Sequence, residues 1–219
     1  MKHFSAPISQ TISRRLWTTS MAVLTGAYLA LQPQWMYASD ITPPPVPTGL
    51  EVPAGHRPFL LGHATGTQNY ICLFPGSDSP WVFVGPQATL FNDDHIQIIT
   101  HFLSPNPDEP DGGSPGRARA TWQHSQDTSA IWAKMITNSA DAAFVKPRAI
   151  PWLLLQRVGA DPGPTKGHRL TETAYIQRVH TSGGLAPTTG CDQAPDIGKR
   201  AFVPYTADYI FYKKAARHK

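Results

Sequence analysis

No apolar run in this sequence is long enough for a good membrane span, which needs about 20 predominantly apolar residues. The stretch Met21–Leu31 (MAVLTGAYLAL) is roughly half that length. Small residues follow it near Ala38, and the charged residues before it are all basic: Lys2, Arg14 and Arg15. This order predicts a secretory signal peptide over residues 1–39, with an uncleaved anchor as the alternative. We therefore expect a secreted or periplasmic protein whose mature chain has no membrane span.

The leader leaves the export route open. The segment SRRLW resembles part of a twin-arginine signal, although two arginines before an apolar region also suit general secretion. No cysteine lies near the expected cleavage position, which excludes a bacterial lipid anchor on a mature N-terminal cysteine.

A basic surplus is also missing once the leader is set aside. The whole chain has 19 Lys and Arg residues against 15 Asp and Glu residues. Residues 1–39 contain three of the basic residues and none of the acidic ones, which leaves the remainder with a net charge near +1. Nucleic-acid binding needs a basic surface on the folded domain. We therefore predict no nucleic-acid partner.

Cysteine is scarce: Cys72 and Cys191 are the only two. The chain has no Cys-X-X-Cys, and no histidine adjoins either cysteine, so a reactive thiol has little support. In an exported protein an isolated pair most simply forms a disulfide. It would close a loop of about 120 residues and contribute on the order of 4–5 kcal/mol in the chain-entropy model.

Catalytic and metal-binding spacings are absent as well. There is no His-X-His and no His-Glu-X-X-His, although His95 and His101 would share a face on one unbroken strand. Ser182 lies near His180 in HTSGG, but adjacent loop residues rarely reach triad geometry. We identify no catalytic residue, no metal site and no cofactor, and whether the protein is an enzyme stays open.

Proline, glycine and short β-type runs are plentiful. Residues 40–53 form a proline-rich lead-in that either spaces the domain or docks along its side. Over residues 54–219, apolar runs rich in β-branched and aromatic residues alternate with turn residues. We expect strands over these segments: 59–74, 81–91, 96–103, 117–124, 130–136, 150–159, 171–181 and 201–214.

Two of these segments have particular features. Gly85-Pro86 should break or bulge the second strand, and 130–136 could form a short helix instead, because Ile131 and Met135 are four residues apart. With about eight short strands and no convincing long amphipathic helix, we predict a single all-β domain with long loops. An antiparallel β-sandwich and a closed β-barrel fit equally well.

Five motifs, GTQNYIC, WVFVGPQATLF, IPWLLLQ, YIQRVHTSGG with a following AP and GC, and VPYTADYIFY, resemble the exported family called domain of unknown function 3455. The resemblance runs from about Val52 to Tyr212 and implies that Cys72 and Cys191 pair, since the family has cysteines at both places. The chain departs from the family at ARATWQH and in the acidic, proline-rich loop before it.

Some fungal relatives carry the label malate dehydrogenase. A nicotinamide dehydrogenase needs a glycine turn between a strand and a helix, with an acidic residue about 20 positions later. TSGGLAP has only an adjacent glycine pair, and DGGSPG lies in an acidic loop that would repel pyrophosphate. We therefore discount the label.

Polar residues within the apolar strands are the candidate site. They could line a pocket in which Arg178 binds an anionic ligand that Asp208 orients, or they could form a structural network that includes an Arg178–Asp208 pair. Gln177 and Arg178 must face opposite sides of a strand. Most aromatic residues should be core, with Trp122 the exception because it lies between polar residues. The candidate residues are Gln68, Asn69, Trp122, Gln177, Arg178, His180 and Asp208.

The function that follows is broad. We expect a ligand-binding or interaction module at the cell envelope, with a small molecule or an envelope component as partner. The alternatives are a secreted enzyme, either a hydrolase or one that modifies small molecules, using Arg178, Asp208 or His180 in a cleft, and a structural or stress-related envelope protein.

Overall fold

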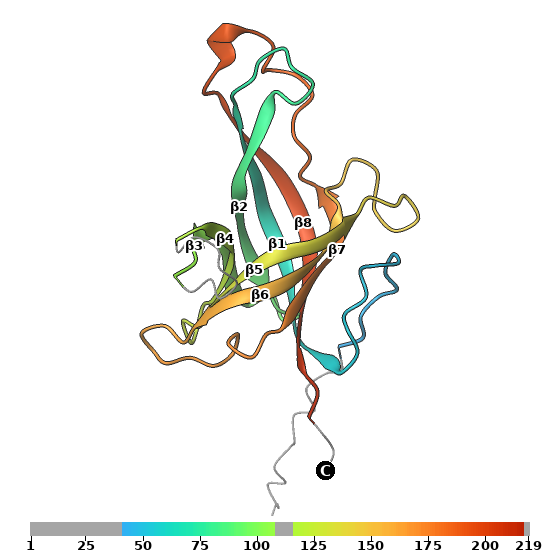
Figure 1. The fold of residues 1–219 in the computed structure, drawn as a ribbon, viewed down its shortest axis with the longest axis vertical. Helices are drawn as coiled ribbons and strands as arrows, with labels where there is room; N and C mark the ends of the chain where they lie inside the picture. The colour runs from blue at the N-terminus through green and yellow to red at the C-terminus, as the bar shows by residue number, and fades with distance from the viewer. Residues whose placement is uncertain (1–40, 108–115, 217–219) are drawn as a thin grey trace, which may run out of the picture. The chain divides into compact units, whose positions relative to one another are not determined.

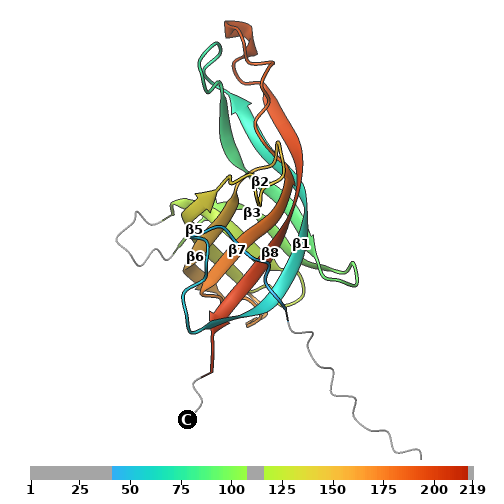
Figure 2. The same cartoon turned by 90° about the vertical axis from the view of Figure 1, so that its right-hand side faces the viewer.

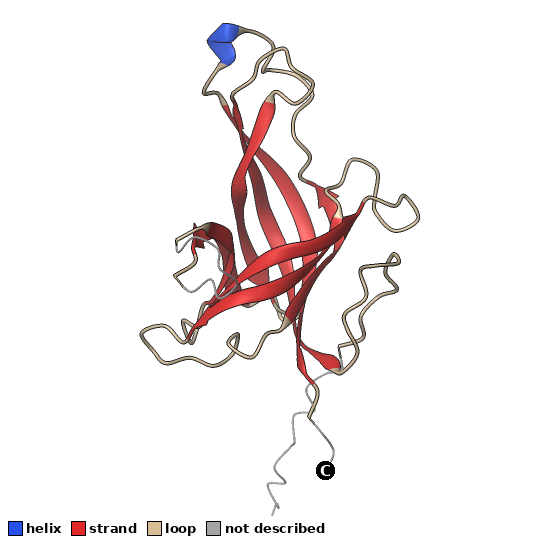
Figure 3. Ribbon diagram, viewed as in Figure 1, coloured by secondary structure: helices blue, strands red, loops and turns tan. Residues whose placement is uncertain are grey.

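The computed structural model describes residues 41–107 and 116–216, which are almost entirely strands and loops (Figure 3). The only helical element in these residues is one short 3-10 turn, η1 (Ala194–Asp196). The strands are β1 (His56–Cys72), β2 (Trp81–Phe91), β3 (Gln97–Pro105), β4 (Ala118–His124), β5 (Ala130–Ser139), β6 (Trp152–Asp161), β7 (Tyr175–Gly183) and β8 (Arg200–Lys214).

The eight strands form a closed barrel (Figure 1). Each strand pairs antiparallel with the next along the chain, and β8 pairs with β1 to close the ring. The prediction of an all-β domain is confirmed, and of the two architectures left open the barrel is the one present. Residues 130–136 belong to β5 and are not helical. The irregularity expected at Gly85 is a bulge, because Asn69 lies opposite Gly85 while Tyr70 lies opposite Phe83.

The interior of the barrel is filled by alternating side chains of each strand. Two interior positions of β1 are glycines, and they lie beside large side chains of β8: Gly62 is opposite Tyr209, and Gly66 is opposite Tyr205. Small residues facing large ones let bulky side chains fit into the interior of a narrow barrel. The buried apolar cluster inside includes Leu90, Ile99, Ile131, Leu155, Ile176 and Phe211.

A second apolar cluster lies on the outside of β6, β7 and β8, where the lead-in and the loop after β5 cover it. Leu50 from the lead-in is only 1% exposed and packs with Trp152, Val179 and Ile210. Gln177 Nε2 donates a hydrogen bond to the Leu50 carbonyl at 2.7 Å. The proline-rich lead-in therefore docks along the barrel, which was one of its two expected arrangements (Figure 2).

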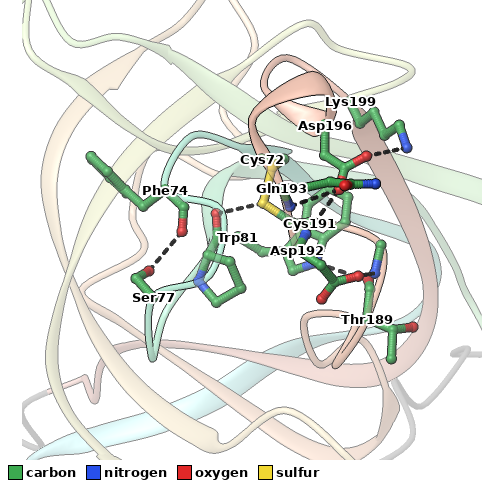
Figure 4. The surroundings of a disulfide bond; sticks show 12 residues. Cys72, Phe74, Ser77, Trp81, Thr189, Cys191, Asp192, Gln193, Asp196 and Lys199 are labelled. Carbon is green, nitrogen blue, oxygen red and sulfur yellow. Dashed lines mark hydrogen bonds and ion pairs between the residues drawn. A yellow bond between two sulfur atoms is a disulfide. The ribbon is translucent and has the colours of Figure 1, made fainter.

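Strands β1, β2 and β8 extend beyond the others as an arm (Figures 1 and 2). The predicted disulfide joins Cys72, at the end of β1, to Cys191 in the loop before β8 (Figure 4). The two Cα atoms are 5.5 Å apart, within the usual range for a disulfide. The Cys72 amide also donates to the carbonyl of Lys199 at 2.9 Å. The glycine-threonine loop thus brings Cys191 back to the tip of the arm.

The signal peptide predicted over residues 1–39 lies outside the described residues and stays a prediction. Among the residues that the structure describes, no helix has the length and apolar character needed to cross a membrane.

Candidate functional site

A cavity of about 230 Å³ opens inside the barrel, and every one of the eight strands contributes to its lining. It lies where the pairing of β4 with β5 has ended, because those strands pair only over Ala120–Gln123 and Ala130–Ala133. The lining includes Gln68, Phe83, His101, Leu103, Trp122, Met135, Arg178 and Tyr209.

Arg178 on β7 brings a charge into this cavity. Its side chain is buried, and its Nη2 donates a hydrogen bond to the Pro151 carbonyl at 2.8 Å. Its Nε is buried without a hydrogen-bond partner, and no carboxylate among the described residues forms an ion pair with it. A buried charge without a counter-charge costs several kcal/mol of solvation. The site therefore favours an anion beside Arg178.

Two neutral groups add further donors to the same cavity. Gln68 Nε2 and Trp122 Nε1 are both buried, and neither has a hydrogen-bond acceptor. An unsatisfied buried donor costs about 1–3 kcal/mol. Among the described residues that line the cavity there is no aspartate or glutamate, and the lining also includes Arg119 and Lys134, which take part in other interactions. The described wall of the cavity is thus rich in hydrogen-bond donors, and Arg178 gives it a buried positive charge.

His101 on β3 lies against this donor group and stays neutral. Its Nδ1 lies 2.8 Å from the Thr121 carbonyl, which can only accept, so Nδ1 carries the proton and donates. Burial lowers the pKa of His101 to about 3. In this tautomer Nε2 is an acceptor, the complement of the N–H groups around it.

The hydroxyl groups near Arg178 also stay protonated. Burial raises the pKa of Tyr70, whose hydroxyl donates to the Gly184 carbonyl at 2.6 Å. Burial, together with the neighbouring Tyr209, raises the pKa of Tyr205. These residues give the interior polar atoms without negative charge.

The structure places three of the predicted residues, Gln68, Trp122 and Arg178, on the cavity wall. The expectation that Trp122 lies outside the core is wrong, because its side chain is fully buried and packs in the interior cluster. Its polar neighbours in sequence face the other side of the strand, as strand alternation requires. Trp122 is therefore both a core residue and a donor to the cavity.

Asn69 and Gln177 lie on the opposite faces of their strands from Gln68 and Arg178. Asn69 Oδ1 accepts a hydrogen bond from Thr67 at 2.7 Å. Gln177 binds the Leu50 carbonyl through its amide nitrogen and accepts from the Tyr212 hydroxyl through its amide oxygen. These two residues take part in structural contacts outside the cavity.

His180 and Asp208 belong to a separate network outside the barrel. Asp208 binds His180 Nδ1 at 2.8 Å and His63 Nδ1 at 2.7 Å, and His63 Nε2 reaches Asp93 at 2.9 Å. The considered Arg178–Asp208 pair does not form, because Arg178 lies opposite Tyr209 and faces inward, whereas Asp208 lies opposite Val179. Asp208 therefore does not orient a ligand of Arg178.

Sequence reasoning missed His101, Tyr205 and Tyr209 as parts of this polar interior. One signal was available for His101, because it shares the strand face of Ile99, which is buried. His95 precedes β3 in the turn after β2, so the two histidines do not share a strand face. Within residues 41–107 and 116–216, no three His, Cys, Asp or Glu side chains form a group suited to a metal ion.

The fold also bears on the dehydrogenase label. Dinucleotide cofactors bind at βαβ units of parallel strands, whereas the barrel consists of antiparallel neighbours throughout. The described chain therefore differs in architecture from that class of enzyme.

Comparison with known proteins gives a family but no activity. No curated protein and no solved structure matches the chain. Residues 53–213, from the lead-in to the end of β8, match the model of the family described as protein of unknown function (DUF3455). The chain therefore belongs to this family, the one that its sequence motifs resemble.

Proposed function

We propose that the protein is an exported ligand-binding module that holds a small organic anion inside its barrel. The observation that carries this proposal is the buried Arg178 guanidinium, which lines a cavity and has no carboxylate partner among the described residues. A bound carboxylate, phosphate or sulfate group would supply the missing charge and accept hydrogen bonds from the guanidinium. It would also satisfy donors that are otherwise buried without partners.

The surrounding groups support an anion over a cation or a neutral polar ligand. Gln68 Nε2, Trp122 Nε1 and the Arg178 guanidinium donate hydrogen bonds and cannot accept them. A cationic ligand would meet like charge and further donors, whereas an anion accepts from all of them. The carboxylates of the outer network, Asp93 and Asp208, are not part of the lining.

The export part of the proposal rests on the leader and on the disulfide. Disulfides persist in oxidising compartments such as the periplasm and the extracellular space, and the chain has one at Cys72–Cys191. Cell fractionation, with mass measurement of the mature N-terminus and of alkylated thiols, tests this part. Retention in the cytosol with an intact leader or two free thiols would contradict it.

The enzyme alternative would use Arg178, Asp208 or His180 in a cleft. Arg178 faces the cavity, whereas the other two residues bind each other on the outside. These three residues therefore do not form one reaction centre. A purely structural role would not explain the cavity and its unpaired donors, whereas ligand binding would.

Thermal denaturation of the purified protein in a panel of small carboxylates, phosphate and sulfate tests the proposal. Matched amides and alcohols serve as neutral controls. A ligand that binds only the folded state raises its stability with the logarithm of ligand concentration above Kd. We expect the anions, and not the neutral analogues, to raise the melting temperature.

Two arginine variants make the test specific to the cavity. Arg178→Met should abolish the anion-dependent shift, and without ligand it should be no less stable than the parent, because it removes a buried uncompensated charge. Arg157→Gln, an exposed arginine on β6, should retain the full shift. Equal shifts in all three proteins would rule out Arg178 as the anion site.

A further inference from the structure

We infer that the anion is the head group of an amphipathic acid, whose apolar tail leaves the cavity across the side chains of Phe83, Leu103 and Met135. This inference rests on the proposed function, because it takes Arg178 as the site of the acid group. It adds the chemical class of the ligand and the direction in which the ligand lies.

The cavity has a polar inner part and an outer part in which exposed apolar side chains lie alongside the partly buried Arg119 and Lys134. Trp122 is fully buried, and Gln68 and Arg178 are only 3% and 9% exposed. Their unpaired N–H groups are buried as well. At the rim of the same cavity, Phe83 is 47% exposed, Leu103 is 36% exposed and Met135 is 54% exposed. A ligand with matching polarity has its charge inside and its hydrocarbon outside.

The rim residues come from three different strands, β2, β3 and β5, and meet at the barrel end where pairing has ceased. The registered pairs of β2 with β3 cover only Ala88–Phe91 and Gln97–His101, so Phe83 and Leu103 lie beyond them. Gly85 lies next to Leu103, since an added Cβ there would be 2.9 Å from its Cδ1. Apolar side chains grouped at a cavity mouth are typical of a ligand groove.

The size of the cavity sets the length of tail that it can enclose. At about 30 Å³ for each water-sized group, a volume of about 230 Å³ holds roughly seven or eight heavy atoms. An acid of about six carbons would fill this space, and each further methylene would extend past the rim. Burying one methylene favours binding by about 0.8 kcal/mol, which is close to fourfold in affinity.

The test is calorimetric titration of the purified protein with linear carboxylates from acetate to decanoate, below their micelle-forming concentrations. Primary alcohols of the same lengths are the neutral series. We expect affinity for the acids to increase by up to about fourfold per methylene until the cavity is full, and then to increase less steeply. Alcohols should bind at least tenfold more weakly than acids of equal length.

Variants at the rim test binding of the apolar tail separately from binding of the acid head group. The double variant Phe83→Ser with Met135→Ser should flatten the dependence on chain length while leaving the short acids unaffected. Phe202→Ser is the matched control, because Phe202 is 59% exposed on the β8 part of the arm and does not line the cavity. It should behave like the parent protein.

The outcomes distinguish this inference from the proposed function. Short and long acids that bind equally, with loss in Arg178→Met, would overturn the apolar tail and leave the anion site standing. Alcohols that bind as tightly as acids, with no effect of Arg178→Met, would overturn the acid head and with it the proposed function. Absence of binding for both series would overturn both.

Discussion

The imidazole of His101 lies flat against the indole of Trp122, with ring centroids 4.2 Å apart and planes inclined by 11°. The stack forms part of the cavity wall, and Tyr209 packs edge-on against both rings. This arrangement buries His101 while its Nδ1 donates to a backbone carbonyl. It fixes which of the two ring nitrogens is left as an acceptor inside the barrel.

We predict that His101 makes the protein less stable as the pH falls below about 6.5. Burial lowers its pKa to about 3 in the folded state, whereas an unfolded histidine titrates near 6.5. Between these values the unfolded chain binds one more proton, so the free energy of unfolding decreases on acidification by up to about 1.4 kcal/mol per pH unit. Chemical denaturation of the parent and of His101→Phe at pH 7 and pH 5 measures this contribution.

His101→Phe should lose less stability between those pH values than the parent does. At pH 7 we expect it to be about 1 kcal/mol less stable, because the hydrogen bond to Thr121 is lost. Histidine NMR gives an independent check. A His101 resonance that titrates near pH 6.5 in the folded protein would contradict the prediction.

We predict that His63, unlike His101, stabilises the folded protein more at low pH than at high pH. Its two ring nitrogens face carboxylate oxygens of Asp93 and Asp208, which only accept, so both nitrogens carry protons in this arrangement. The hydrogen bond to Asp93 is the largest cause that raises the pKa of His63; burial opposes it, and Asp208 adds to the increase. The protonated form is therefore favoured by folding.

Because the folded pKa of His63 is above the unfolded value, its stabilising contribution is complete below pH 6.5 and is lost as the pH rises through the folded pKa. His63→Gln should therefore cost more stability at pH 5.5 than at pH 9. His168→Gln, the same replacement at another exposed histidine, is the matched variant for comparison. The effect should be small, because exposed ion pairs contribute about 0–1 kcal/mol. In Asp93→Asn, NMR should show a lower His63 pKa; an unchanged value would contradict the assigned cause.

The strands were predictable from the sequence because each is a run rich in β-branched and aromatic residues between turn residues. Closure was not, since it depends on β1 pairing with β8, such as His63 opposite Asp208, across most of the chain. No local pattern encodes that pairing. The sequence therefore fits a sandwich and a barrel equally well, and the pairing of β1 with β8 in the structure distinguishes them.

The candidate site was predictable only in part. The side of the barrel wall on which a side chain lies depends on the register of the strands as well as on residue type. Alternation correctly placed Gln177 and Arg178 on opposite faces. The register of β7 on β8 then set Arg178 opposite Tyr209 and kept it away from Asp208. A bulge between Val179 and Ser182, where His180 has a φ of 51°, changes the alternation again. Such a bulge leaves little trace in a single sequence.

The disulfide should contribute more to stability than any single contact in the arm. Cys72 and Cys191 are 119 residues apart in sequence, and closing a loop of that size is worth about 4–5 kcal/mol in the chain-entropy model. The double variant Cys72→Ala with Cys191→Ala should lose about that free energy of unfolding. Denaturation of the parent with and without a reductant is the matching measurement.

Hydrogen exchange should show which part of the fold opens most readily once the disulfide is removed. We expect the amides near the arm tip, including Cys72 and Gly198, to lose protection while those of β6 and β7 keep it under native conditions. These two amides are hydrogen-bonded across the tip, Cys72 to Lys199 and Gly198 to Cys72. Uniform loss of protection over the barrel would show that the arm does not open by itself.

Glycine at position 66 should be required for the approach of β1 to β2. An added Cβ would lie 2.1 Å from the Gln87 carbonyl oxygen and 2.5 Å from the Ala88 Cα, and backbone atoms cannot move aside as a side chain can. At Gly62 the nearest atom would be the Leu90 Cδ2, 2.8 Å away at the end of a side chain. Overpacking typically costs about 1–3 kcal/mol. We therefore expect Gly66→Ala to reach or exceed the upper end of that range and Gly62→Ala to cost clearly less. Urea denaturation of the two variants tests this order. Equal stability of Gly66→Ala and the parent would mean that the backbones of β1 and β2 lie farther apart at this position, since the methyl group has no other space.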